Sequence, residues 1–515
     1  MKSNNHFGKD CLRHKLCKIL LLVSISAFSQ LPSNMNTVAN FHSPPSGGGS
    51  LTRGWVLDMK LLSSGDVVTV GYTANNTYAA IYPTITKRVG GTLIYEQVLT
   101  CISGMYLTMF DTPAGYVVFG TGNEVGSCSP HNGYFSVLLD KSTGLPISNW
   151  SIKFYDGATI SSSPKTLAGG LATFDRLTND IPSFCEIKNT AGSITGYMIC
   201  GNYSAGYMST LQNYSDGSFL LMTDVLGNVD CSFGNNGLVY FHQTGAGSTK
   251  YLNSHVNAVA VDYNTAGKPQ GFVACGFLNE NPLTAPAYSE DNIDAFIIKT
   301  NLTGNILWED IYDDNVHRKN GLAYGIPYLD NPDFGSCANT NLLTKPQENN
   351  NEMAIRLVQD RATGDFLVLN RFDYVYGYLY SGCPSSYPTS GLLTFADPTL
   401  LRIQSNNTVI WSQNLFQSSG VDYENDLELL PNGSEVLVLG CTTTNNLIFQ
   451  EAVVSKVDIN TSAILYERVY ASSASGQTMI CPFTLSSDGV LGSIGGDADG
   501  TSINWDYYES YIFQY

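Results

Sequence analysis

The chain has 515 residues, of which 43% are hydrophobic and only 14% are charged, so it can form a sizeable core. Its formal net charge of −18 repels phosphate backbones and anionic membrane surfaces, which argues against nucleic acid as a partner. Glycine (49) and tyrosine (31) are abundant, a composition typical of all-β proteins with many turns. The length suits about two to four ordinary domains or one large repeat fold.

Residues 1–29 have the pattern of a cleaved export signal. The alternative is a disordered basic tail. Five basic residues precede the apolar run Ile19–Phe28, and Ala27-Phe28-Ser29 is a small-x-small cleavage site. The run is too short to span a bilayer, and no other segment approaches that length. Cleavage removes five basic residues and one acid, so the net charge becomes −22. We therefore expect a protein without a transmembrane segment that is secreted, periplasmic or at the cell surface.

A hairpin recurs along the chain, with a turn residue four positions before an aromatic residue. The pairs are Gly91/Tyr95, Gly304/Trp308, Asn407/Trp411 and Ser462/Tyr466. In two further copies Trp150 is displaced by two positions and Cys231 stands in the aromatic place. The six hairpins span residues 85–99, 138–150, 221–233, 297–312, 401–416 and 455–470.

A second hairpin precedes each of these and ends in an apolar strand, so one unit reads strand A, turn, strand B, loop, strand C, turn, strand D. Six full units are followed by a seventh that lacks strand D. Units of about 50 residues with four antiparallel strands predict a β-propeller over residues 51–515. Residues 30–50 are then a linker whose segment 36–42 can supply the missing strand and close a seven-bladed ring. An open β-solenoid is the alternative.

The hairpin pattern, an apolar strand followed by K-x-(D/N)-x-x-G-N-x-L-W, resembles the blade repeats of secreted bacterial propellers, as common in Bacteroidota, with PQQ-like and delta-sixty-type units. Residues 223–241 are similar to the delta-sixty repeat. The matching positions are Gly227, Asp230, Phe233, Gly234 and Gly237. The resemblance spans about residues 51–515 and implies the fold, whereas such families carry diverse roles.

The two faces of such a propeller differ in this chain. The A–B and C–D turns lie on one face, here named the plain face, and are short. The B–C and D–A connections lie on the other, the long-connection face, and hold the irregular segments 123–132, 156–181, 277–292, 313–352 and 373–391. Long loops in a compact domain are often functional, so we expect the ligand on this face. The alternative is that insertions accumulated there without function, because loops tolerate them.

The tyrosines of the segment 373–391 are the candidate ligand-binding residues. Four of them recur at period 2 and would point to one side of an extended segment. Exposed, they would form a stacking platform for a glycan or a protein; buried, they would pack against the insertion 313–352. The candidates are Tyr374, Tyr376, Tyr378, Tyr380 and Tyr387.

Ten cysteines remain after signal removal, and disulfides persist in an oxidising compartment. Cys101 with Cys128, and Cys337 with Cys383, are plausible staples of long loops. Cys185 and Cys200 are equidistant from the centre of their A–B turn and could face each other across the hairpin. Cys275 and Cys441 fit better as small buried hydrophobes.

Asp497 and Asp499 alternate before a glycine, like the start of a calcium loop, but the rest of an EF-hand is absent. They are a weak Ca²⁺ candidate, with an acidic turn as the alternative, and no other cofactor is expected. No nucleophile elbow, Walker A loop or H-E-x-x-H motif occurs. The sequence therefore favours a binding module for a glycan or protein over catalysis. A propeller-type glycan hydrolase or lyase with axial carboxylates and a structural component of an extracellular assembly are the alternatives.

Overall fold

The computed structural model describes the strands and the turns that join them. No helix in this part of the chain is long and apolar enough to cross a membrane. The described residues are 36–40, 51–75, 81–90, 92–125, 132–147, 152–155, 184–203, 217–241, 250–282, 293–312, 350–377, 392–415, 422–430, 432–443, 450–470, 478–486, 489–497 and 508–514.

The described strands form seven four-stranded antiparallel sheets, which we number as blades along the chain. Blade 1 contains β2 (Leu51–Leu61), β3 (Val67–Asn75), β4 (Ile81–Val89) and β5 (Thr92–Val98). Blade 2 contains β6 (Ile102–Thr112), β7 (Gly115–Glu124), β8 (Asn132–Leu139) and β9 (Lys153–Tyr155). Blade 3 contains β10 (Phe184–Lys188), β11 (Ile194–Tyr203), β12 (Gly217–Asp224) and β13 (Leu238–Phe241). Blade 4 contains β14 (Lys250–Tyr263), β15 (Pro269–Pro282), β16 (Ile293–Asn301) and β17 (Ile306–Tyr312).

The remaining blades follow the same order, apart from the last. Blade 5 contains β18 (Asn350–Gln359), β19 (Phe366–Gly377), β20 (Leu392–Ile403) and β21 (Val409–Asn414). Blade 6 contains β22 (Asp422–Leu429), β23 (Glu435–Thr443), β24 (Gln450–Asp458) and β25 (Ile464–Tyr470). Blade 7 contains β26 (Thr478–Ser486), β27 (Gly489–Asp497), β28 (Tyr508–Gln514) and, as its outer strand, β1 (Asn36–Asn40).

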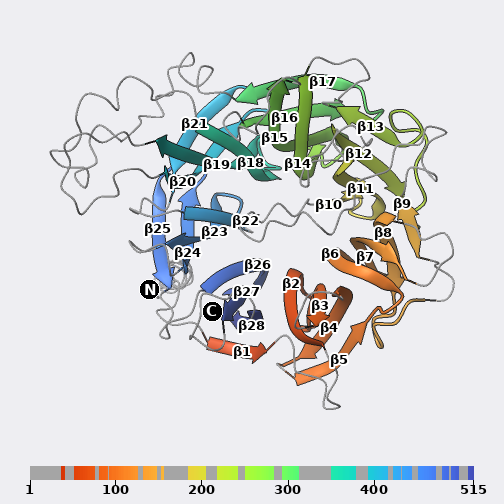
Figure 1. The fold of residues 1–515 in the computed structure, drawn as a ribbon. Coiled ribbons are helices and arrows are strands. Elements are labelled where there is room, and N and C mark those ends of the chain that lie inside the picture. The colour runs from red at the N-terminus through yellow and green to blue at the C-terminus, as the bar shows by residue number, and fades with distance from the viewer. Residues whose placement is uncertain are drawn as a thin grey trace, which may run out of the picture.

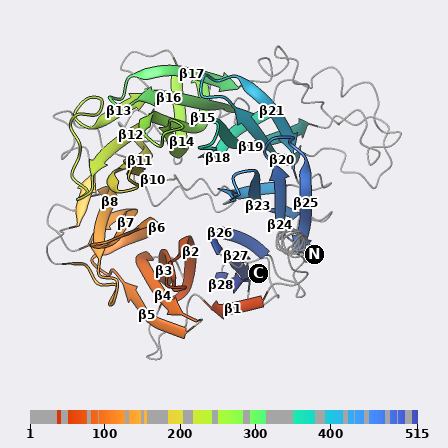
Figure 2. The same cartoon turned by 180° about the vertical axis from the view of Figure 1, so that it is seen from behind.

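The sheets stand in a ring around a central axis, with the first strand of each blade innermost (Figures 1 and 2). Strand β1 lies antiparallel to β28, with Asn36 opposite Gln514 and Asn40 opposite Tyr511. The N-terminal strand therefore supplies the outer strand that the last unit lacks, as predicted. The prediction of an all-β propeller with four-stranded blades is confirmed.

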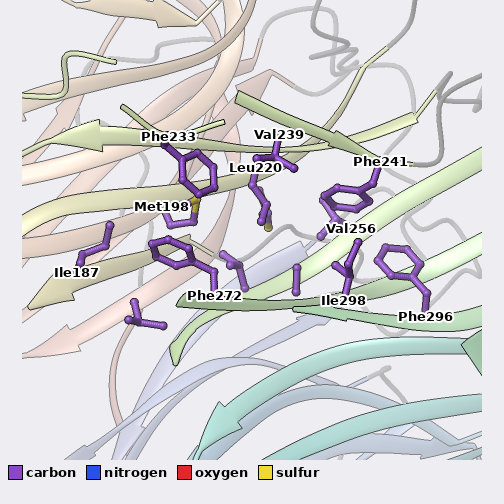
Figure 3. Packing of buried hydrophobic residues seen from close by; sticks show 14 of the residues in the cluster. Ile187, Met198, Leu220, Phe233, Val239, Phe241, Val256, Phe272, Phe296 and Ile298 are labelled. Carbon is purple, nitrogen blue, oxygen red and sulfur yellow. The ribbon is translucent and has the colours of Figure 1, made fainter. Parts of the chain in front are cut away.

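The hydrophobic core lies between neighbouring blades, because each sheet buries both of its faces. Strand B shows this most clearly: Phe366 and Val368 pack toward blade 4, while Leu367 and Leu369 pack toward blade 6. Between blades 3 and 4 a further cluster joins side chains of both sheets, with Phe233 edge-on to Phe272 at a ring distance of 5.6 Å (Figure 3).

A recurrent β-bulge explains the aromatic position of the repeated hairpin. The register shifts between strands C and D in blades 1, 4, 5 and 6, just before the aromatic residue. The residue left out of the pairing is aliphatic and exposed by 42–56%. A bulge rotates the next side chain, so the aromatic residue faces the following blade. The exposed bulge residues are Ile94, Leu307, Ile410 and Leu465.

Side chains of strand D bind the C–D turn of the next blade and form what we call the inter-blade ladder. Trp308 Nε1 donates to the carbonyl of Ser405 at 3.1 Å, and Trp411 Nε1 donates to that of Ile459 at 3.0 Å. In blade 1, Tyr95 Oη donates to Lys141 O at 3.4 Å. These bonds lie on the plain face, so the repeated aromatic residues hold the ring together.

Blades 2 and 3 correct two sequence-based predictions. Tyr155, not Trp150, supplies the ladder bond of blade 2, donating to Gly227 O at 2.9 Å; Trp150 lies outside the described residues. Cys231 does not take the aromatic place: it is exposed in a C–D loop that extends to Gly237, before β13. The prediction that plain-face turns are short throughout is therefore wrong for these two blades.

Candidate axial site

Charged side chains from three blades meet near the axis and form what we call the axial charge cluster. On the innermost strand of blades 1, 5 and 6, the charged residues come directly after a β-bulge. The register shifts after Val56, Ala354 and Glu424. Residues two apart on a strand point to the same face, so the cluster shares one side of these strands. Its members are Asp58, Lys60, Arg356, Asp426 and Glu428, and the charge of Glu186 on β10 of blade 3 also acts on Lys60.

Asp58 serves the ring as well as the cluster. Its carboxylate accepts hydrogen bonds from Thr108 Oγ1 at 2.7 Å and from the N–H of Met109 at 2.9 Å, both on blade 2. It also lies 3.7 Å from Lys60 Nζ, whose side chain is 41% exposed. The pKa of Lys60 is raised chiefly by the charge of Asp58, so Lys60 is a solvent-accessible cation beside a fixed anion.

The carboxylates of blade 6 have a different environment. Arg356 Nε of blade 5 lies 3.9 Å from Asp426 Oδ1, with the two side chains 15% and 24% exposed. Burial raises the pKa of Asp426, against the opposing charge of Arg356. Burial, and then the charge of Asp426, raise the pKa of Glu428 to about 7. Glu428 therefore exchanges a proton near neutral pH beside a second carboxyl group.

The placement of these two carboxyl groups is compatible with acid–base chemistry. Asp426 and Glu428 are two positions apart on one strand, so their side chains leave the same face of the sheet. Glycosidases use a pair of facing carboxyl groups, and the acid of the pair has a raised pKa. Among the described residues no group of three His, Cys, Asp or Glu side chains is arranged to hold a metal ion.

The predicted ligand tyrosines lie at the edge of what the structure describes. Tyr374 and Tyr376 belong to β19, opposite Phe395 and Leu393 of β20, so this part of the segment 373–391 extends strand B. Tyr378, Tyr380 and Tyr387 are outside the described residues. Their role as a stacking platform stays a prediction.

The predicted Ca²⁺ pair is only half described. Asp497 is the last residue of β27, opposite Tyr508, and Asp499 lies outside the described residues. The proposed calcium loop therefore stays a prediction.

The cross-strand disulfide expected between Cys185 and Cys200 does not form. The register places Cys185 opposite Met198, because Phe184 already pairs with Ile199, and Cys185 is a free thiol. The prediction placed the centre of the turn between Gly192 and Ser193, but the turn is closed by Asn189 and Ser193 and centres on Ala191. Cys275 is buried, as predicted.

The predicted loop staples are described only in part. The thiol of Cys101 is exposed, and the backbone carbonyl of Cys101 accepts a hydrogen bond from the N–H of Val125 at 2.8 Å. The described residues do not include its expected partner Cys128, nor Cys337 and Cys383. The side chain of Cys441 is not described either.

The axial charges were missed at the sequence level, although their signal is present. In strands A that are otherwise apolar, charges interrupt "WVLDMKLL", "AIRLV" and "NDLELL". Taken one by one, these charges look like the solvated positions of a half-exposed strand. Only the ring brings the strands of blades 1, 5 and 6 around one axis.

No protein-family model and no curated protein matches the chain. Among solved structures it is similar to the PilY1 C-terminal domain of Pseudomonas aeruginosa, with 9% identity and a TM-score of 0.33 over 84% of this chain and 90% of that one. The WD40 domain of SCAP from fission yeast shares 8% identity and a TM-score of 0.29, covering 94% and 98%. Prolyl oligopeptidase B from Galerina marginata shares 7% identity with a TM-score of 0.29 over 88% of this chain. This chain spans only 56% of that enzyme's length. The fold assignment rests on this chain's own strand pairing.

Proposed function

We propose that this protein is an exported binding module of the secreted bacterial propeller type, and that it binds a glycan or a protein on its long-connection face. The observation that carries the proposal is the inter-blade ladder. Turns of the plain face are occupied in holding neighbouring blades together, by Tyr95, Tyr155, Trp308 and Trp411. Their carbonyl acceptors are therefore already engaged.

The connections at the opposite end support the same assignment. Strand A follows a D–A connection and strand B precedes a B–C connection, so both kinds of connection reach one face of the ring. The longest of them join β17 to β18, β9 to β10, β19 to β20 and β11 to β12. Variable connections on a rigid strand scaffold are where propellers and other β-folds place binding residues.

The ligand class follows from charge and side-chain type. The acidic chain disfavours polyanions. Tyrosine rings bind sugar faces and protein surfaces through apolar area with a polar tip. We therefore place the ligand contact at Tyr378, Tyr380 and Tyr387.

A glycan array and a pull-down with the mature chain test this proposal. Replacing Tyr378, Tyr380 and Tyr387 by alanine should remove binding while the unfolding midpoint in urea stays unchanged. The matched control replaces Leu307 and Ile410, which are exposed on the outer strands by 56% and 42%, and should leave binding intact. Equal loss in both variants, or retention in both, would place the ligand elsewhere.

A second candidate is a glycan hydrolase or lyase that uses the axial carboxyl groups. The raised pKa of Glu428 beside Asp426 favours it. In hydrolysis the Glu428 carboxylic acid would protonate the departing glycosidic oxygen, and the Asp426 carboxylate would take the proton from the attacking water. Release of reducing sugar from a glycan panel tests it: Glu428→Gln should abolish turnover, whereas Glu435→Gln, on the same blade but outside the axial charge cluster, should retain it. Absence of turnover by the unaltered chain would eliminate this candidate.

A further inference from the structure

Two fully buried asparagines, Asn257 and Asn370, lie next to the same residue, Ala354, between blades 4 and 5. Asn257 is the bulged residue of β14, and its Nδ2 donates to the carbonyl of Ala354 in blade 5 at 3.0 Å. Asn370 lies on β19 directly opposite the same Ala354. Both asparagines are 0% exposed. The two amides therefore approach one backbone position from two blades.

The side chain of Asn370 points toward blade 4. On β19, Phe366 and Val368 pack in the cluster that contains Cys275 and Ile297 of blade 4. Asn370 continues this alternation, since residues two apart on a strand share a face. Residues directly opposite in an antiparallel pair also share a face, so Ala354 lies beneath the Asn370 amide.

Three polar atoms in this place have no hydrogen-bond partner in the part of the chain that the structure describes. They are Oδ1 of Asn257 and both Oδ1 and Nδ2 of Asn370. Buried amides in native proteins are almost always paired, with protein or with ordered water. The set combines acceptors with a donor, which one water molecule can satisfy, because water donates twice and accepts twice.

Two alanines beside the asparagines have short side chains, which favours room for a water molecule. Ala354 lies opposite Asn370, and Ala258 follows the bulge at Asn257. Both alanines are buried in the same cluster. A larger residue at either position would bring apolar atoms against the amides. The site is thus polar, enclosed and lined by short side chains, which are the conditions under which an internal water is retained.

We propose that a water molecule is bound between blades 4 and 5, where it bridges Asn257 Oδ1 and the Asn370 amide and joins the two sheets. This site is independent of the ligand face proposed above.

Asn202 of β11 shows how a strand-B asparagine is satisfied without water. Its Oδ1 accepts from the N–H of Val256 at 2.8 Å and from Ser218 Oγ at 3.3 Å, and its Nδ2 lies 3.1 Å from Nδ1 of His255. Asn202 therefore joins blades 3 and 4 directly. It is the matched control for Asn370.

A high-resolution crystal structure of the mature chain tests the site. We expect density for a water within about 3.2 Å of Asn257 Oδ1 and of the Asn370 amide. Asn370→Leu should lose this water and leave the ring unchanged, with a smaller fall in urea midpoint than Asn202→Leu, which removes the acceptor of the Val256 N–H and the Asn202 hydrogen bonds of Ser218 and His255. A direct bond between the two amides, a partner from another segment of the chain, or a dry site in the unaltered protein would overturn the proposal. Should Asn370→Leu not crystallise, water cross-relaxation to the Asn370 amide protons decides the same question in solution.

Discussion

Replacing the buried Arg402 by methionine should weaken the contact between blades 5 and 6 and lower the free energy of unfolding. Arg402 Nη2 lies 2.8 Å from Asp365 Oδ2 and 3.4 Å from Asp360 Oδ2, and Nη1 donates to the carbonyl of Ile459 in blade 6 at 2.6 Å. The side chains of Arg402, Asp360 and Asp365 are only 8%, 4% and 13% exposed. Methionine keeps most of the apolar stem but removes the charge.

The expected loss of stability is about 3 kcal/mol. Removing one partner of a buried ion pair costs about 3–5 kcal/mol, because the other charge stays buried and unpaired. The lower end applies, since Asp360 keeps hydrogen bonds from Thr363 Oγ1 at 2.7 Å and from the N–H of Ala362 at 3.0 Å. The Ile459 carbonyl also keeps its bond from Trp411 Nε1. The main cost therefore comes from the two carboxylates.

Urea unfolding of residues 30–515 measures this loss, because urea does not screen charges as guanidinium does. The control is Lys456→Met, the corresponding strand-C position of blade 6. Lys456 lies 2.7 Å from Glu435, in a pair that is 12% and 21% exposed and stays within one blade. It should cost less than Arg402→Met, because a single carboxylate loses its partner and no contact with another blade is broken. Equal losses in the two variants, or a loss below about 1 kcal/mol for Arg402→Met, would refute the argument from burial.

Three further changes have defined outcomes. The pKa of Glu428 is about 7 in the folded chain against an ordinary value of 4.5, so stability falls as pH rises between these values. Glu428→Gln should match the unaltered chain at pH 4 and exceed it at pH 8 by at most about 3 kcal/mol, and parallel pH curves would contradict this. Phe233→Ala should cost about 3–5 kcal/mol in urea unfolding, since the ring is 0% exposed, whereas Ile94→Ala should change stability by less than about 0.5 kcal/mol. Deleting residues 30–42 removes β1 and exposes the edge of β28, so size-exclusion chromatography should show oligomers that a synthetic peptide of residues 36–42 reverses; an unaltered monomer would count against ring closure by β1.

Much of the fold could be predicted because its signals are local. The turn residues Gly304, Asn407 and Ser462 have positive φ, at 81°, 72° and 60°, as the hairpin pattern requires. Continuous apolar runs such as Phe366–Leu369 indicate strands buried on both faces. The missing strand of the last unit also pointed to the N-terminus, because an unpaired sheet edge must be covered.

The errors arose where one residue more or less changes the pairing. The disulfide between Cys185 and Cys200 failed because the turn between their strands centres on Ala191 and not between Gly192 and Ser193. The hairpin spacing predicts that strand D of blade 3 follows Gly227 directly, with Cys231 at the aromatic position, but the loop runs on to Gly237. In the structure Gly234 instead donates its N–H to Thr303 O at 2.9 Å, replacing the aromatic contact of other blades.

By itself, the sequence determined the strands, their grouping into repeated four-stranded units and the strand that closes the ring, because periodicity and turn chemistry act over a few residues. Only the tertiary structure decided which charges meet at the axis and which amides meet between blades. Asp58 and Asp426 are more than 360 residues apart in the chain, yet each influences the pKa of Glu428. Such proximity depends on the closing of the ring and on bulges that turn single side chains, and neither is written in any one strand.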